Sequence, residues 1–373
     1  MKPSGKYGSM SYYNIYQGKK VLVTGHTGFK GSWLSIWLKE LGADVYGYSL
    51  APYSEMDNFV KCKLEDQIHH QEGDVRDAAK LKKYVEDVQP DFAFHLAAQP
   101  LVLLSYTDPA RTFDTNLMGT VNFFEAVRAT PSVKVAVNVT TDKCYDNKEW
   151  VWGYRENDPM GGNDPYSASK GCSELITNSY YKSFFEKEGT CNIASARAGN
   201  VIGGGDWALD RIVPDYFRAV KNNQKLEIRN PYATRPWQHV LEPLSGYLNL
   251  GAELFLKGKC FSGGWNFGPE DSTNYSVKEL VDCILNSHSD GGYVIPENSD
   301  KLQEAILLKL DISKALCYLK WRSVLNFKET VEFTLHGYLA DLDISNDTYK
   351  SRIEQIALYK QKAAAKEICW SLL

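Results

Sequence analysis

The 373-residue sequence has no segment long and apolar enough to cross a membrane, and no Cys-x-x-Cys pair of the kind that binds zinc. Its eight cysteines are scattered, so neither a disulfide framework nor a metal centre is predicted. Reduced thiols are typical of a cytoplasmic protein. The sequence also lacks a basic excess, with a formal charge of −4, so we expect no binding to nucleic acid or to a membrane. Internal repeats and low-complexity segments are absent as well.

A glycine-rich turn follows the first apolar run, Lys19 to Thr24, and precedes a helical pattern that stops at Gly42. Glycines at 25, 28 and 31 permit a tight turn, close approach to a pyrophosphate and close packing of the helix on the strand. The helix N-terminus also favours an anion. The pattern predicts a dinucleotide site, with a purely structural loop as the alternative. Its candidate residues are Gly25, Thr27, Gly28, Phe29, Lys30 and Gly31. For Lys30, a solvated side chain at a helix start is an equal alternative.

The second strand, Asp44 to Ser49, lacks the terminal acidic residue that usually binds the adenosine ribose, and no arginine stands there for a 2′-phosphate. NAD is therefore favoured over NADP. Asp74 and Val75 are candidates for the adenine edge, with a helix cap as the alternative for Asp74. Small residues after the fourth strand allow the nicotinamide ribose to pass close to the backbone. The further cofactor candidates are Leu96, Ala97 and Ala98, with Asn116 on a helix from Phe113 to Ala129.

Strands and helices alternate over residues 18–200, which is typical of a parallel sheet with helices on both faces. We predict an α/β fold, a Rossmann-type doubly wound parallel sheet with a smaller C-terminal substrate-binding domain. The expected parts are a loose N-terminal arm at 1–17, an NAD-binding domain at 18–200 to which some later segments return, a mainly substrate-binding domain at 201–345, and a helical tail at 346–373.

Tyr166 and Lys170 lie four residues apart at the start of an amphipathic helix, so their side chains share one face. A fixed cation nearby lowers the pKa of a tyrosine, which is about 10 in water. Tyr166 would then accept a proton from a hydroxyl while a hydride leaves the same carbon. Chance occurrence in an ordinary helix is the alternative, because the pattern fixes two positions only. An earlier strand delivers Thr141, Asp142 and Lys143 at the sheet edge where ligands bind.

These motifs together resemble the extended short-chain dehydrogenase/reductase superfamily over residues 17–340. Within it, the chain is similar to CDP-glucose 4,6-dehydratases in the stretches GHTGFKGSWLSIWL, HLAAQPLV, TTDKCYDN, PYSASKG, ARAGNVIGGGDWALDRIVPD and ATRPWQHVLEPLSGYL. Thr-Asp-Lys stands where the related dTDP-glucose dehydratases carry Thr-Asp-Glu. Simple epimerases carry no such acid/base pair after the threonine.

The resemblance implies oxidation of a hexose at carbon 4, loss of water across carbons 5 and 6, and return of the hydride to carbon 6, with NAD as a bound catalyst. It implies Tyr166 as the base, Lys170 as the cation that assists it, and Thr141 as the hydroxyl that bonds the reacting oxygen. Asp142 would protonate the leaving hydroxyl, and Lys143 would be the base at carbon 5, which requires a lowered pKa. A surface Asp-Lys pair in a loop is the alternative.

Substrate contacts are expected chiefly from the C-terminal half. Asn200 is a candidate for the sugar diphosphate, and Arg211 and Arg235 are candidates for its phosphates, because arginine offers a planar fork to phosphate oxygens. Gln99, within HLAAQPLV, completes the set by resemblance. A surface or salt-bridging role is the alternative for both arginines.

The resemblance names CDP-glucose as the substrate, but nothing in the residues themselves selects cytidine. A nucleotide-sugar epimerase, a 4,6-dehydratase for another nucleotide-hexose and an inactive NAD-sensing scaffold stay open as alternatives. Relatives pair through two long helices, here 113–129 and 166–188, so a homodimer or homotetramer is implied. The implied setting is deoxysugar and lipopolysaccharide O-antigen biosynthesis in the cytoplasm.

Overall fold

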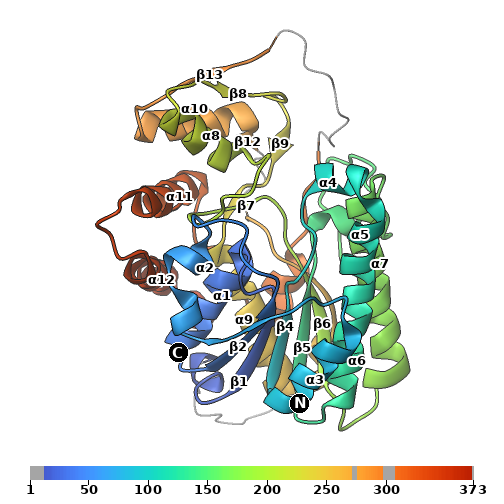
Figure 1. Ribbon diagram of the computed structural model, residues 1–373. Helices are drawn as coiled ribbons and strands as arrows, with labels where there is room; N and C mark the ends of the chain where they lie inside the picture. Colours follow the sequence, from blue (N-terminus) through green and yellow to red (C-terminus); the bar gives the residue numbers. More distant parts are fainter. Residues whose placement is uncertain (1–11, 271–274, 297–306, 372–373) are drawn as a thin grey trace.

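The computed structural model describes residues 12–270, 275–296 and 307–371. Their centre is a seven-stranded sheet in the order β11-β6-β5-β4-β1-β2-β3, with parallel pairing throughout (Figure 1). The strands are β1 Lys20–Thr24, β2 Asp44–Ser49, β3 His69–Glu72, β4 Phe92–His95, β5 Val135–Val139, β6 Asn192–Arg197 and β11 Gly263–Asn266. The predicted Rossmann-type α/β fold is confirmed. Strand order reverses between β1 and β4, and such sheets bind ligands at the carboxyl ends of strands beside this switch point.

The central strands are apolar on both faces because helices cover both sides of the sheet. In β1, Val21 and Val23 point into one core and Leu22 into the other, as the alternation of side chains along a strand requires. One face is covered by α1 Phe29–Glu40 and α9 Leu241–Lys257, and α12 Thr348–Ala365 packs against α1. The other face is covered by α3 Ala78–Val88, α6 Gly119–Ala129 and α7 Pro165–Tyr180 (Figure 1).

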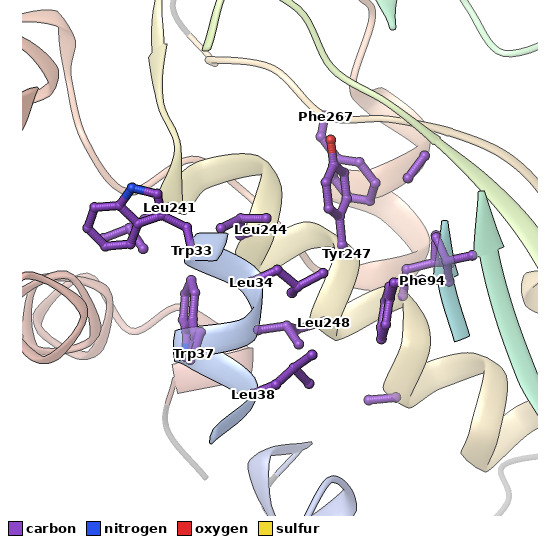
Figure 2. Close-up of a cluster of buried hydrophobic side chains, with 14 of the residues drawn as sticks. Trp33, Leu34, Trp37, Leu38, Phe94, Leu241, Leu244, Tyr247, Leu248 and Phe267 are labelled. Atoms are coloured by element: carbon purple, nitrogen blue, oxygen red, sulfur yellow. The ribbon is translucent and has the colours of Figure 1, made fainter. Parts of the chain in front are cut away.

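The larger core lies between α1, α9 and the sheet. Figure 2 shows Leu34 and Leu38 of α1 beside Leu244 and Leu248 of α9, with Phe94 of β4 on the sheet side. These five side chains are all buried. Their packing fixes α1 against the sheet, and therefore fixes the glycine-rich turn from which α1 starts.

Shorter helical elements connect the strands. They are α2 Asn58–Lys61, α4 Val102–Thr107 and α5 Pro109–Phe113, with 3-10 turns at Tyr12–Ile15, Leu64–Asp66, Asp142–Cys144, Gly258–Phe261 and Cys369–Ser371. Three π-helical turns occur at Asp114–Met118, Tyr181–Phe185 and Ala315–Leu319. The predicted helix from Phe113 to Ala129 thus comprises the last residue of α5, a π-helical turn and α6, and the helical stretch begins earlier, at Pro109.

A second, smaller unit packs above the carboxyl edge of the sheet (Figure 1). It contains α8 Ile212–Lys221, α10 Val277–Ser287 and α11 Phe327–Leu342 around a core of their apolar faces. Its strands pair in twos: β7 Val201–Ile202 with β10 Gln238–His239, β9 Thr234–Arg235 with β12 Tyr275–Ser276, and β8 Leu226–Glu227 with β13 Tyr293–Val294. Residues 271–274 and 297–306 of the predicted substrate-binding domain lie outside the described residues.

The two ends of the chain differ in how far they follow expectation. Residues 1–11 of the predicted arm lie outside the described residues, but a loose arm is wrong for its last part. Tyr16 is buried, packs its ring 4.9 Å from that of Phe92, and donates a hydrogen bond to Leu248 O at 2.6 Å. α12 occupies most of the predicted helical tail, of which residues 372–373 are not described. Within the described ranges, no helix has both the length and the hydropathy to span a bilayer.

Candidate active site

The turn between β1 and α1 lies at the switch point of the sheet. Gly25 has φ +76°, and a Cβ there would lie 2.6 Å from Ala97 N. A Cβ at Gly31 would lie 2.1 Å from Gly25 O. Packing of the protein alone therefore requires glycine at both positions. At Gly28 the nearest atom would be 3.4 Å away, an ordinary contact, so the exposed side of this residue has room for a phosphate at the start of α1.

Two other turn residues contact neighbouring segments. Thr27 Oγ1 lies 2.7 Å from Ser49 Oγ and donates to Leu50 O at 2.9 Å, which ties the turn to the end of β2. The Phe29 ring lies against Gly203 of the smaller unit. The carboxyl end of β2 thus offers hydroxyl groups where a carboxylate usually binds the adenosine ribose.

After β3, Asp74 accepts hydrogen bonds from Arg76, including one from Nε at 2.9 Å. The Arg76 guanidinium is the largest influence on the Asp74 carboxyl and lowers its pKa. The helix-cap alternative for Asp74 is wrong, because Asp77 accepts the capping bond of α3 from Lys80 N. Val75 is buried against Gly119 and lies beside Asp74 at this edge.

The loop after β4 is fixed by two buried amides. Gln99 N donates to Asn116 Oδ1 at 2.8 Å, and Asn116 Nδ2 donates to Gln99 O at 3.1 Å and to Ser169 Oγ of α7 at 2.9 Å. Gln99 Nε2 donates to Leu101 O and to Thr112 Oγ1, both at 3.0 Å. These bonds join the loop that carries Leu96, Ala97 and Ala98 to α7. Direct ligand contacts of Gln99 and Asn116 stay predictions.

Thr141 and Asp142 meet where β5 ends. Thr141 Oγ1 donates to Asp142 Oδ1 at 2.9 Å, and Asn200 Nδ2 donates to Asp142 Oδ2 at 3.2 Å. Asp142 is only 2% exposed and borders a cavity of about 30 Å³. Lys143 is half-buried, and its amine has no ion pair within the described part of the chain. The structure therefore brings Thr141, Asp142 and the predicted substrate residue Asn200 together, and contradicts a surface position for Asp142.

Tyr166 and Lys170 occupy the buried face of α7, whose start is capped by Asp164. Contrary to expectation, the pKa of Tyr166 is raised: burial raises it to about 12, against lowering contributions from Thr141 and Arg211. Burial also lowers the pKa of Lys170 to about 8. The Thr141 hydroxyl and the Tyr166 phenol nevertheless act on each other in one site.

Lys30 and Arg211 add positive charge to the same site. Burial, then the Arg211 guanidinium, lower the pKa of Lys30 to about 8, while Asp142 acts in the opposite direction. Arg211 Nη1 donates to Asp206 Oδ2 at 2.6 Å, so Asp206 holds this guanidinium. Lys30 is half-buried in this site. Arg235 lies on β9, where it donates to Thr234 O at 2.9 Å, and its contact with phosphate stays a prediction.

The sequence and the fold are similar to those of known proteins. A model of the GDP-mannose 4,6 dehydratase family matches residues 22–334. The CDP-glucose 4,6-dehydratase of Salmonella typhimurium is 51% identical over 323 residues, which cover 85% of this chain and 90% of that protein. The chain belongs to this family of nucleotide-sugar 4,6-dehydratases.

More distant members of the nucleotide-sugar 4,6-dehydratases are also similar. The human dTDP-D-glucose 4,6-dehydratase is 25% identical over 332 residues, 86% of this chain and 90% of that protein. Among solved structures, a dTDP-glucose 4,6-dehydratase of Streptomyces venezuelae with NAD bound has a TM-score of 0.72 at 22% identity and covers 86% of this chain and 97% of that one. The epimerase Mth375 of Methanothermobacter thermautotrophicus has a TM-score of 0.75 at 24% identity and covers 94% and 97%. These two structures show the shared fold.

Two polar residues of this site were not predicted from the sequence. Asp206, in the stretch GGGDW, positions Arg211. Glu174 lies one helical turn beyond Lys170 and is only 4% exposed. Glu174 could have been found from its position four residues after Lys170. This spacing places its carboxylate on the same face of an amphipathic helix. Among the described residues, no group of three metal-ligating side chains occurs.

Proposed function

We propose that this protein converts CDP-glucose to CDP-4-keto-6-deoxyglucose with bound NAD. The observation that carries the proposal is the 51% identity to the Salmonella CDP-glucose 4,6-dehydratase over nearly the full length of both chains. The site supports it, because Thr141, Asp142 and Tyr166 lie together at the switch point of the sheet. An oxidoreductase without an elimination step would not need a buried acid beside the threonine.

The residues of the NAD site are proposed because the glycine turn has space for a pyrophosphate. Gly25 to Gly31 would hold the pyrophosphate at the start of α1, and the backbone at Ala97 and Ala98 would border the nicotinamide ribose. The hydroxyls of Thr27 and Ser49 fit an adenosine ribose, and the sequence from Ser49 to Tyr53 has no arginine for a 2′-phosphate. NAD bound there would supply a hydride acceptor for carbon 4 and a hydride donor for carbon 6.

For oxidation, Tyr166 accepts the proton of the 4-hydroxyl while the Thr141 hydroxyl bonds the same oxygen. The pKa of Tyr166, about 12 in this structure, requires more positive charge beside the phenol before it acts as a base. Arg211 supplies one such charge, and the ammonium of Lys170 holds the nicotinamide ribose. Oxidation therefore depends on assembly of the whole site and not on Tyr166 alone.

For elimination, the 4-ketone acidifies the proton on carbon 5, and Lys143 removes it. Asp142 donates a proton to the 6-hydroxyl, which leaves as water. Lys143 returns its proton to carbon 5 as the hydride reaches carbon 6. Asn200 keeps the Asp142 carboxyl oriented through its hydrogen bond, and Arg211 and Arg235 bind the diphosphate.

The test is a substrate panel of CDP-, dTDP-, UDP- and GDP-hexoses with NAD, read by the formation of a 4-keto-6-deoxy sugar. We expect product from CDP-glucose, with no net reduction of NAD. Product from dTDP-glucose and none from CDP-glucose would overturn the substrate assignment. An epimerised hexose that retains its 6-hydroxyl would overturn the reaction.

The proposal extends to organisation and assembly. A cofactor domain over 18–200 and a mainly substrate-binding domain over 201–345 are proposed, with α9 and β11 returning to the large sheet. A homodimer or homotetramer through the helices 113–129 and 166–188 is supported by the exposed apolar side chains of Met118, Leu175 and Phe184. A cytoplasmic role in deoxysugar and O-antigen synthesis is proposed from the resemblance. Sedimentation analysis of the purified protein tests the assembly, and a monomer at micromolar concentration would contradict it.

A further inference from the structure

A buried network of hydrogen bonds lies directly beneath the catalytic residues, with Glu174 at its centre. Its carboxylate accepts hydrogen bonds from Thr140 Oγ1, from Ser195 Oγ at 2.6 Å and from Arg197 Nη2 at 2.7 Å. Both members of the Glu174–Arg197 ion pair are 4% exposed. Burying two charges costs free energy of desolvation. Close contact and additional hydrogen bonds to both partners are needed to offset that cost.

Each partner of Glu174 belongs to a segment that carries a residue of the site. Thr140 precedes Thr141 directly in the chain, so its bond attaches the end of β5 to α7. Arg197 Nη1 donates to Tyr145 Oη at 2.6 Å, and Tyr145 follows the turn that contains Asp142 and Lys143. Tyr145 Oη in turn donates to Asn266 Oδ1 of β11 at 2.7 Å. Glu174 therefore anchors both ends of the segment from Thr140 to Tyr145.

The same carboxylate lies one turn from Lys170 on the buried face of α7. Burial opposes ionisation of Glu174, yet Arg197 and the neighbouring hydroxyls keep its pKa below the ordinary value. Its charge raises the pKa of Lys170, against the larger lowering by burial. The other titratable groups that face Lys170 are Cys144 of the turn after β5, His95 of β4 and Lys30 of α1. Of these titratable residues, Glu174 is the one with a carboxylate.

We propose that Glu174 is a positioning residue that keeps Lys170 charged and holds the segment from Thr141 to Lys143 against α7. Arg197 supports this effect, because it keeps Glu174 ionised against burial. The inference rests on the proposed function, since Lys170 is taken to act as an ammonium during turnover.

The experiment compares the pH dependence of kcat in the full-length wild type, Glu174→Gln and Arg197→Gln, each with NAD and CDP-glucose. Glu174→Gln removes the negative charge, so the basic limb of the profile should move to lower pH by about one unit or more. Arg197→Gln removes the partner that keeps Glu174 ionised against burial, so the limb should move in the same direction. A shift of the limb in both variants, in place of a uniform loss of rate, is not expected from a loss of stability.

Glu242→Gln is the matched control, because Glu242 is another buried carboxylate, bonded to Val324 N, Leu325 N and the Tyr359 hydroxyl in a different part of the molecule. Its thermal stability can change, but its basic limb should coincide with that of the wild type. If Glu174→Gln does not fold, Arg197→Gln decides by itself. A profile that is only scaled down, or a limb that moves to higher pH in either variant, would overturn the proposal.

The pH dependence of NAD binding is measured on the same proteins to separate this inference from the proposed function. If the wild type forms no 4-keto-6-deoxy product, the proposed function fails. The NAD-binding limb then still tests Glu174, because Lys170 is placed beside the cofactor. Unshifted NAD binding in both variants would contradict the inference under either outcome.

Discussion

Positively charged side chains crowd the site at the residue scale. Lys30, Lys170 and Arg211 act on one another or on the same neighbours, and the carboxylates of Asp142 and Asp206 only partly compensate them. Such crowding suits a site that receives a pyrophosphate and a sugar diphosphate, but it costs stability while those anions are absent.

Lys30→Met should therefore stabilise the protein. Because the pKa of Lys30 is about 8 in the folded state and its ordinary value is 10.5, the buried charge destabilises the folded state fully below pH 8. Between about pH 8 and 10.5 the folded state releases this proton while the unfolded state retains it, so the destabilisation fades. We expect a gain of about 1–3 kcal/mol in the free energy of unfolding at pH 7, shrinking above pH 8.

Urea denaturation at several pH values measures this effect, with Lys39→Met on the same helix as the control that should stay within about 0.5 kcal/mol of the wild type. NAD affinity should fall at the same time in Lys30→Met. A gain in stability that is independent of pH would contradict the explanation by charge.

Lys143→Ala should separate the two halves of the reaction. Oxidation at carbon 4 persists because Tyr166, Thr141 and Lys170 are intact, whereas elimination slows by about 10²-fold or more and a 4-keto-hexose with its 6-hydroxyl accumulates. Rapid quench with mass spectrometry measures both species. Lys148→Ala is the matched control, since Lys148 lies in the same loop, is exposed and pairs with Asp146. Equal loss of oxidation and elimination in Lys143→Ala, as expected for Tyr166→Phe, would remove the role assigned to Lys143.

At the scale of elements, the glycine turn between β1 and α1 matters most for the proposed NAD site. Its glycines have different roles. Gly31→Ala should destabilise the protein by about 1–3 kcal/mol, because the added Cβ would meet Gly25 O at 2.1 Å. Gly28→Ala should change stability by less than about 1 kcal/mol, because its Cβ meets only an ordinary contact at 3.4 Å.

Thermal unfolding and NAD titration together check this pair. The methyl group of Gly28→Ala occupies the room proposed for the pyrophosphate, so NAD affinity should fall about tenfold or more, equivalent to about 1.4 kcal/mol. Unchanged NAD affinity in Gly28→Ala would show that the pyrophosphate lies elsewhere.

Regular elements could be predicted from the sequence because local patterns determine them. The strands near 19–24 and 44–49 and the helix that starts at Tyr166 follow from apolar periodicity and capping residues. The π-helical turn at Asp114–Met118 could not be predicted, because it depends on the contact of buried Asn116 with Gln99 and Ser169.

Site residues divide in the same way. Thr141 and Tyr166 are recognisable by motif. The raised pKa of Tyr166 and the buried position of Lys30 are properties of the assembled site, and the sequence contains no local signal for burial of these groups. The helical pattern could have indicated Glu174. It could not indicate the partners Ser195 and Arg197, because they belong to a strand distant in the sequence.

At the scale of the whole molecule, the C-terminal helices belong to the body that supports the site. Arg352 of α12 is fully buried, pairs with Asp341 of α11 and donates to Asn58 Oδ1 at 2.9 Å. Asp341 Oδ2 accepts a hydrogen bond from Gly205 N at 2.7 Å, in the loop that leads to Asp206 and Arg211. The tail beyond the matched family region thus braces the loop that leads to Asp206 and Arg211.

Arg352→Met should destabilise the protein by about 3–5 kcal/mol, because it leaves the Asp341 carboxylate buried without its partner. Lys350→Met on the exposed face of the same helix should cost less than about 0.5 kcal/mol. Equilibrium denaturation measures both. The account of the tail as part of the body would be wrong if deletion of residues 346–373 left stability and activity unchanged.

The most direct test of the central claim follows a label from CDP-glucose carrying deuterium at carbon 4. One site that oxidises carbon 4, eliminates water and returns the same hydride should give CDP-4-keto-6-deoxyglucose with the deuterium at carbon 6, read by NMR. Deuterium retained at carbon 4, or lost to solvent, would contradict the account.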